Sequence, residues 1–221
     1  EDWVRAHGTI DPPALERWHK ALQTRTHFIP AKIDETYGDI GFDKAEVTEV
    51  DAVLLNLLQD WQLFRANDLL GDGISAPFPP LLSSADVGPL GACQLPRTWL
   101  KTCLRASDLL HRDYPDCADG SLDQRCIATL QLDQDQTLAF LRDNMPTYLE
   151  FEEWVRTEGT IDAAAIAAFN ERLLNREHIP AKLEDIHGTL NKPNDGTWTG
   201  GVLLNHLEDW KYAHTALLDA D

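Results

Sequence analysis

Four histidines in the last third of the chain are the clearest candidates for chemistry: His178, His187, His206 and His214. Imidazole is the side chain whose pKa lies closest to neutral pH, so a histidine can serve as a general acid or base. His178 stands just before a proline-led helix start, where the helix dipole disfavours the charged imidazolium. We therefore predict that His178 is neutral at pH 7 and is the catalytic acid or base.

His206 and Asp209 are three residues apart, which places them on one face of a predicted helix. Asp209 would orient a histidine, and His206 is the second catalytic candidate. Mixed imidazole and carboxylate groups can also bind a metal, but this spacing matches no zinc motif such as HExxH. We predict no metal site, and the sequence names no cofactor.

Two cations complete the predicted chemistry. Lys182 ends the apolar run Ile-Pro-Ala-Lys. It is either a desolvated lysine with a lowered pKa, acting as a catalytic nucleophile or charge stabiliser, or a lysine paired with the neighbouring Glu184 or Asp185. Arg97, Lys101 and Arg105 form a short basic stripe on another helix. Arg97 would bind an anionic group of the substrate, unless it pairs with an aspartate.

Several motifs are absent from the sequence. It has no P-loop, no GxGxxG after a strand, no GxSxG elbow and no HxE with CxxC. These absences argue against nucleotide-binding, dinucleotide-binding and serine-hydrolase functions.

The elements that must hold these residues form an internal repeat. Residues 2–26 match residues 153–177 at ten of 25 positions, and VLLNLLQDW at 53–61 returns as VLLNHLEDW at 202–210 with seven of nine positions identical. Ordered identity of this kind indicates a duplication. The chain then consists of two arms, 2–70 and 153–218, that flank a central segment.

Polar residues retained in both arms are candidates for function, because core packing alone would retain only apolar ones. The alternative is a structural role, in which arginines pair with carboxylates and Asn and Asp bind backbone groups at helix ends. These pairs are Arg5 with Arg156, Arg25 with Arg176, His27 with His178, Lys32 with Lys182, Asn56 with Asn205 and Asp60 with Asp209. We predict that Arg176 binds substrate together with Arg97. The unrepeated Trp99 and Trp198 are predicted to line the pocket, whereas the repeated Trp61 and Trp210 are predicted to be buried in the core.

Helical signals run along the whole chain. Asp11 and Asp162 are predicted N-caps, and prolines start and glycines end the short helix of each arm. The predicted helices cover 12–26, 163–176, 30–38, 180–188, 50–70, 200–219, 97–111, 122–130, 134–143 and 147–157. No stretch shows sustained strand-like alternation, so we predict an all-α helical bundle.

The predicted domain plan follows from these elements. Residues 1–70 are the N-terminal arm, residues 71–92 are a linker or lid rich in Gly, Pro and Ser, and residues 93–221 are a helical domain that contains the second arm. We expect the parts to share one core.

Composition limits the partners. The chain of 221 residues has 19 Lys plus Arg against 37 Asp plus Glu, a net charge of -18, which disfavours nucleic acid and anionic membranes. No apolar run approaches the roughly 20 residues of a membrane-spanning helix. We expect a soluble cytoplasmic protein, with the periplasm or secretion as alternatives, that binds a small molecule and can form a homodimer.

The four cysteines, Cys93, Cys103, Cys117 and Cys126, are confined to the middle of the chain. Their spacings fit neither a CxxC pair nor a zinc ribbon, and a chain of this size does not need disulfides for its stability. We expect free thiols.

The order of several blocks resembles a bacterial family classed as a domain of unknown function. The blocks are LPRTWLKTCLRAS at 95–107, SLDQRCIATLQLD at 121–133, EEWVRTEGTIDAAAIAAFNERLLNREH at 152–178 and LLNHLEDW at 203–210. The resemblance covers roughly residues 90–218 and implies a helical fold, with no activity, cofactor or catalytic residue. The N-terminal arm departs from the pattern of that family by repeating its second half.

Two functional hypotheses follow. The first is a small-molecule enzyme that uses acid-base chemistry, as a lyase, isomerase or hydrolase, in a cleft between the arms. The second is a non-catalytic helical module that binds a ligand or a protein partner.

Overall fold

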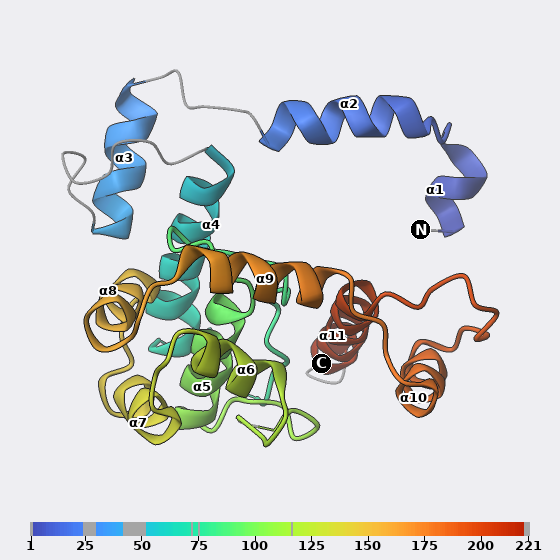
Figure 1. Ribbon diagram of the computed structural model, residues 1–221. Coiled ribbons are helices and arrows are strands. Elements are labelled where there is room, and N and C mark those ends of the chain that lie inside the picture. The colour runs from blue at the N-terminus through green and yellow to red at the C-terminus, as the bar shows by residue number, and fades with distance from the viewer. Residues whose placement is uncertain are drawn as a thin grey trace. The chain divides into compact units, whose positions relative to one another are not determined.

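The computed structural model describes residues 2–23, 30–41, 52–71, 73–74, 76–115 and 117–218. In these residues it contains eleven α-helices, one π-helical segment and no strand, and β-type pairing is confined to two isolated bridges. The elements, drawn in Figure 1, are α1 (Asp2–His7), α2 (Pro12–Gln23), α3 (Pro30–Ile40), α4 (Ala52–Leu63), η1 (Phe64–Leu69), α5 (Leu95–Ala106), α6 (Leu122–Thr129), α7 (Gln134–Asn144), α8 (Tyr148–Glu158), α9 (Ala163–Leu174), α10 (Pro180–Leu190) and α11 (Gly201–Leu218). The predicted all-α fold is confirmed.

Capping side chains account for the starts of the long helices. Asp162 is the N-cap of α9 and accepts hydrogen bonds from the backbone N–H groups of Ala164 and Ala165, at 2.9 and 3.1 Å. Asp11 accepts one from Ala14 at the start of α2, at 3.2 Å. Both predicted N-caps are confirmed.

The bounds of the helices recur at the spacing of the two predicted arms. Helices α2 and α9 cover paired residues, as do α3 and α10, which both begin at a proline, and α4 and α11 begin at the paired residues Ala52 and Gly201. A common origin for the two arms stays a prediction. Several predicted ends are wrong. Helices α3 and α10 run past Gly38 and Gly188 to Ile40 and Leu190, so the glycines do not end them. Helix α5 ends at Ala106 and not at residue 111, since Asp108 adopts a left-handed conformation with φ 57°.

The chain divides into two compact units, Glu1–Asp60 and Trp61–Asp221. The division falls within α4, ahead of residue 70, where the first arm was predicted to end. In the first unit, Tyr37 and Ile40 of α3 are buried, and Gln59 of α4 donates a hydrogen bond to Asp39.

The second unit is built around α5. Helix α5 packs against α6, α7 and α8, while α9 packs against α6 and α11, and α10 against α11. Every residue from Leu95 to Leu104 is buried, including the cations Arg97 and Lys101. Lys101 pairs with Asp123 of α6, a carboxylate that also accepts hydrogen bonds from Thr98 and Gln94.

An aromatic cluster fills the space between α5, α8 and the end of α4. The Tyr148 ring lies edge-on to Trp61 at 4.9 Å and to Trp99 at 5.7 Å, between ring centroids. Trp61 is 4% exposed, which confirms its predicted burial, and Trp99 is 1% exposed. The expectation that Trp99 lines a pocket is wrong, because its indole is enclosed in this core and donates to the Pro146 carbonyl at 2.9 Å.

The segment predicted as a linker or lid lies against the helices over its described part. The backbone N–H of Leu90 donates to the Glu152 carboxylate at 2.9 Å, and the backbone N–H of Gln94 donates to the Ser84 carbonyl at 2.9 Å. Gly88 lies so close to α8 that a Cβ there would be 2.2 Å from Tyr148 Cε1 and 2.5 Å from Glu152 Oε1.

Replacing Gly88 with Ala is expected to destabilise the protein by about 1–3 kcal/mol, since a buried ring and a hydrogen-bonded carboxylate must move. The free energy of unfolding, measured in denaturant, checks this. Gly188→Ala in α10 is the matched control, because nothing lies within 4 Å of a Cβ at that position. Ala there is expected to be neutral or to stabilise the helix by about 0.5–1 kcal/mol, and equal losses in the two variants would contradict the close contact.

Candidate functional site

Arg97 of α5 and Asp209 of α11 form a buried ion pair. Arg97 Nη1 is 2.6 Å from Asp209 Oδ2 and Nη2 is 3.0 Å from Oδ1, and the side chains are 8% and 1% exposed. Burial alone would lower the pKa of Arg97, but the charge of Asp209 and its hydrogen bonds raise that pKa above its usual value. Arg97 thus pairs with an aspartate. This was the alternative to the predicted role of Arg97 in binding a substrate anion.

Three further groups surround this pair. Arg97 also donates to the backbone carbonyls of Pro80 and Leu82, and the Tyr114 hydroxyl donates to Asp209 Oδ1. Burial and the negative charge of Asp209 raise the pKa of Tyr114, so it stays a donor. The prediction that Asp209 orients a histidine is wrong, because both of its oxygens serve Arg97 and Tyr114.

Two other predicted residues, His178 and Lys182, both face α11. His178 Nε2 lies 2.8 Å from Asn205 Oδ1, and Lys182 Nζ lies 2.8 Å from Asp185 Oδ2 and 3.5 Å from Glu208 Oε1. Burial acts to lower the pKa of Lys182, but the hydrogen bond to Asp185 and the charge of Glu208 raise it above its usual value. Lys182 is therefore charged. The hypothesis that Lys182 is a nucleophile with a lowered pKa is wrong.

His178 is held neutral. Burial lowers its pKa, and the positive charge of nearby Arg176 lowers it further, against the opposing hydrogen bond to Asn205. This direction agrees with the predicted neutral histidine, although the causes are burial and a neighbouring cation in place of the helix dipole. The N-terminal counterparts Arg25 and His27 lie outside the described residues.

His206 and Trp210 of α11 pair with each other, and His206 Nδ1 is buried. The Trp210 indole donates to His206 Nε2 at 3.0 Å and is 54% exposed. The predicted burial of Trp210 is wrong, because α11 turns Asp209 inward and successive helical residues point about 100° apart. Trp198 is half-buried, and its backbone carbonyl accepts a hydrogen bond from His187 Nε2 at 3.0 Å.

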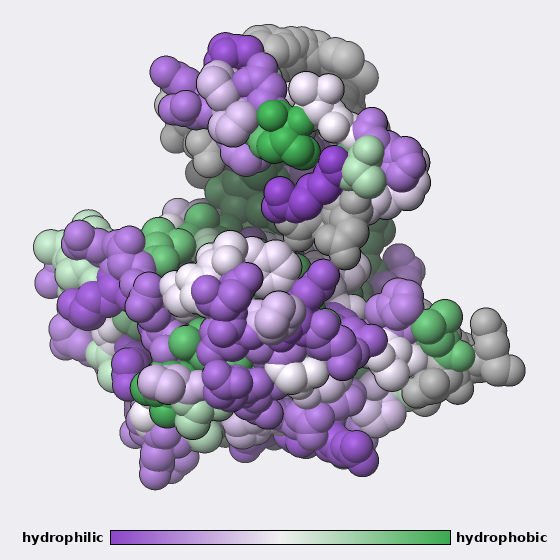
Figure 2. Space-filling model, turned by 90° about the vertical axis from the view of Figure 1, so that its right-hand side faces the viewer, coloured by the Kyte–Doolittle hydropathy of each residue, from purple (hydrophilic) through white to green (hydrophobic). Residues whose placement is uncertain are grey.

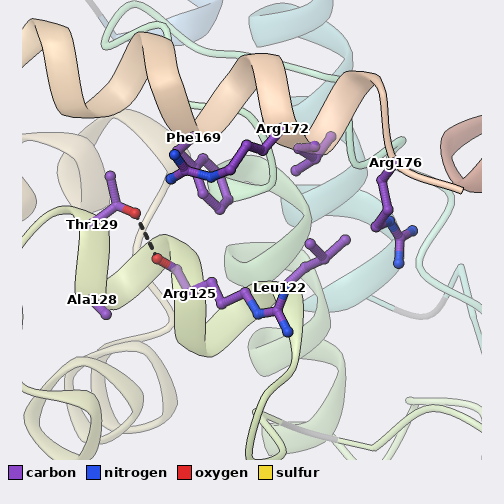
Figure 3. Close-up of a pocket in the computed structure, with 8 residues that line it drawn as sticks. Leu122, Arg125, Ala128, Thr129, Phe169, Arg172 and Arg176 are labelled. Atoms are coloured by element: carbon purple, nitrogen blue, oxygen red, sulfur yellow. Dashed lines mark hydrogen bonds between the residues drawn. The ribbon is translucent and has the colours of Figure 1, made fainter.

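A pocket of about 380 Å³ lies between α6 and α9. Its residues combine an apolar floor with three arginines: Leu122, Arg125, Ala128 and Thr129 from α6, Phe169, Arg172 and Leu173 from α9, and Arg176 just beyond α9. Figure 3 shows the three guanidinium groups around the space between the two helices. We call it the arginine pocket.

Helix packing creates the arginine pocket from two amphipathic faces. Phe169 and Leu173 are 4% and 2% exposed and form the apolar stripe of α9. Ser121 caps α6 by accepting a hydrogen bond from the Gln124 N–H. The arginines lie at the edges of these faces, so they reach the pocket while the stripe fills the interface.

The three arginines have no carboxylate partner in the ion pairs of the described chain, where Arg97, Lys101, Arg112, Arg156 and Lys182 pair with acids. Arg176 Nε and Nη2 are buried without a hydrogen-bond partner among the described residues. Burial lowers the pKa of Arg176, and nearby Arg125 lowers it further. Neighbouring cations that lack an acid between them favour a bound anion.

Sequence reasoning found one of these arginines and missed two. Arg176 was predicted as a substrate-binding residue from the repeat, and it lines the arginine pocket, whereas Arg97, Trp99 and Trp198 do not. Nothing in the sequence marks Arg125 or Arg172 as a binding residue, because a single arginine on an amphipathic helix is typical of a solvated face. Only the packing of α6 on α9 brings them together.

Two further features are absent from the described residues. They contain no group of three or more His, Cys, Asp or Glu side chains arranged to hold a metal ion. None of their helices combines the length and the apolar character that crossing a membrane requires. Cys93, Cys103 and Cys126 are buried thiols, as predicted.

The sequence matches no protein-family model, and no curated protein is significantly similar to it. The resemblance to a bacterial family of unknown function therefore stays a prediction.

Replacing Asp209 with Asn should destabilise the protein by about 3 kcal/mol, because the buried Arg97 loses its counter-charge. The matched control is Asp60→Asn, the exposed aspartate at the same position of the repeated motif on α4, where a change within about 0.5 kcal/mol is expected. Thermal and denaturant unfolding measure both. Similar small effects in the two variants would show that the Arg97–Asp209 pair does not hold α11 in place.

Proposed function

We propose that the chain is a non-catalytic binding module for small organic anions that carry an apolar part. The observation behind the proposal is the arginine pocket, in which three arginines without acidic partners in the described chain surround an apolar floor. The proposal is the second of the two hypotheses drawn from the sequence, with the ligand specified by its charge and its apolar part.

The acidity of the chain makes arginines without acidic partners unusual. With a net charge of -18, carboxylates outnumber cations almost two to one, so a cation without a partner is unexpected. Guanidinium groups bind carboxylate and phosphate through paired N–H donors. An anion that reached Arg176 would supply the acceptor that its buried Nε and Nη2 lack.

The floor of the arginine pocket adds a second requirement. Leu122, Phe169 and Leu173 present hydrocarbon, so an alkyl or aryl group gains about 25 cal/mol for each Å² of apolar surface that it buries there. The volume of about 380 Å³ falls within the usual range of small-molecule sites.

Octanoate is expected to bind in isothermal titration calorimetry, more tightly than octanol, which lacks the charge. Arg176→Gln and Arg172→Gln should each weaken octanoate binding by roughly tenfold or more, because a hydrogen bond to a charged group contributes about 1.5–3 kcal/mol. Added salt should also weaken it by screening.

Arg112→Gln is the control, since the Arg112 side chain is 90% exposed and lies outside the arginine pocket. Its octanoate affinity should equal that of the unmodified protein. Equal binding of octanoate and octanol, or an equal loss in all three variants, would refute the anion site.

A second candidate, the acid-base enzyme, is supported by one observation. The neutral imidazole of His178 lies near Arg176, which lines the arginine pocket, so a bound anion and a potential proton acceptor are neighbours. In this candidate Arg176 binds the substrate anion, and His178 accepts or returns a proton as a lyase, isomerase or hydrolase requires.

The pKa of His178, measured by NMR titration, should lie below the ordinary value of 6.5. Arg176→Gln should raise that pKa by removing a nearby positive charge, and bound octanoate should raise it by adding a negative one. Activity would be lost as the pH falls through the pKa of His178 in the folded protein, because imidazolium cannot accept a proton. A pKa at or above 6.5 that neither change moves would exclude His178 as the base.

A further inference from the structure

The arginine pocket is elongated. Its lining runs along α6 from the first residue of that helix, Leu122, to the last, Thr129. A helix of this length extends about 10 Å, at 1.5 Å for each residue. Phe169 and Leu173 of α9 add hydrocarbon along the pocket. On the face of the protein that Figure 2 shows, hydrophobic residues likewise form small groups within a mainly hydrophilic surface.

Two of the three arginines lie at the Leu122 end of the pocket. Burial lowers the pKa of Arg176, and the positive charge of Arg125 lowers it further, so these two guanidinium groups are neighbours. In Figure 3 both side chains turn toward the side of the pocket where Leu122 lies. The start of α11 fixes this end, since a Cβ at Gly201 would be 3.0 Å from Arg176 Nε.

The third arginine, Arg172, lies at the opposite end. It belongs to the last turn of α9, and in Figure 3 its side chain runs away from Arg176, toward the side of the pocket where Thr129 lies. The arginine pocket therefore has a positive charge at each end and hydrocarbon along its length.

We propose that the ligand of the arginine pocket is a dianion with one carboxylate at each end of a short hydrocarbon chain. One carboxylate binds Arg125 and Arg176, and the other binds Arg172. The chain between them lies along Phe169 and Leu173. This inference rests on the proposed anion-binding function and specifies the chemical class of the ligand.

The balance of charge favours a two-ended ligand. The three arginines have no carboxylate partner in the ion pairs of the described chain. A monoanion compensates one of these three charges, and a ligand with both charges in one head group leaves Arg172 uncompensated. Two separate carboxylates reach both ends, and each can accept paired N–H donors from a guanidinium group.

Isothermal titration calorimetry of the full chain at pH 8 and constant ionic strength tests the proposal with four ligands. Suberate should bind roughly tenfold or more tightly than octanoate, in which a methyl group replaces the second carboxylate. Hexyl phosphate matches suberate in aliphatic carbons and nearly in charge, but it carries both charges at one end, so it should bind more weakly than suberate. Succinate, which is too short to reach both ends, should also bind more weakly.

The ratio of suberate affinity to octanoate affinity, measured in each variant, locates the second carboxylate. Arg172→Gln should reduce this ratio to about one, because a single cationic end remains. Arg112→Gln is the matched control and should leave the ratio unchanged, since the Arg112 side chain is exposed and lies outside the arginine pocket. Circular dichroism checks the fold of each variant, and the four ligands on the unmodified protein test the proposal independently of the variants.

Three results would overturn the two-ended ligand: suberate that binds no more tightly than octanoate, hexyl phosphate that binds as tightly as suberate, or a ratio that R172Q does not change. Each of them leaves the anion site standing when octanoate still binds more tightly than octanol. Octanoate that binds no more tightly than octanol refutes the proposed function, and this inference with it.

Discussion

The buried pair between Arg97 and Asp209 determines how the second unit is assembled. Two opposite charges are removed from water at a cost that only good geometry and full hydrogen bonding offset. Asp209 accepts from Arg97 and Tyr114, and Arg97 also donates to the carbonyls of Pro80 and Leu82. One ion pair therefore connects α5, α11, the segment before α5 and the loop after it. With Asp209 fixed inward, the rotation of α11 about its axis is fixed.

That rotation determines the surroundings of the candidate site. With Asp209 inward, Asn205 contacts His178, just before α10, and Glu208 contacts Lys182 in α10. The start of α11 is fixed at Gly201, whose missing side chain leaves room for the Arg176 guanidinium, since a Cβ there would be 3.0 Å from it. The Gly201 N–H also donates to the Arg176 carbonyl at 2.7 Å. Arg176, and with it one side of the arginine pocket, is thus positioned by α11 although its other walls come from α6 and α9.

The sequence was sufficient where local signals decide the outcome. N-cap aspartates, proline starts and the apolar stripe of α9 fix the helix positions through interactions within a few residues. It was insufficient where partners are distant. Asp60 and Asp209 occupy the same motif position, yet only Asp209 meets Arg97, which is 112 residues away. The neighbouring tryptophans consequently have opposite environments, and no local pattern separates Trp61 from Trp210. The same limit hid Arg125 and Arg172, whose meaning comes from the packing of α6 on α9.

If the arginine pocket binds an anion as proposed, the acidity of the chain and the pocket act together on the choice of ligand. A net charge of -18 repels anions at long range, but ions screen this repulsion over about 8–10 Å at physiological salt. Within that distance the three arginines of the pocket would attract an anion. Small inorganic anions gain only this local attraction and stay strongly hydrated. An anion with an alkyl or aryl part also buries hydrocarbon on Phe169 and Leu173, a contribution that the repulsion does not affect. At the proposed anion site, the overall charge would therefore discriminate against simple anions, and burial on the apolar floor would compensate only ligands that carry an alkyl or aryl part.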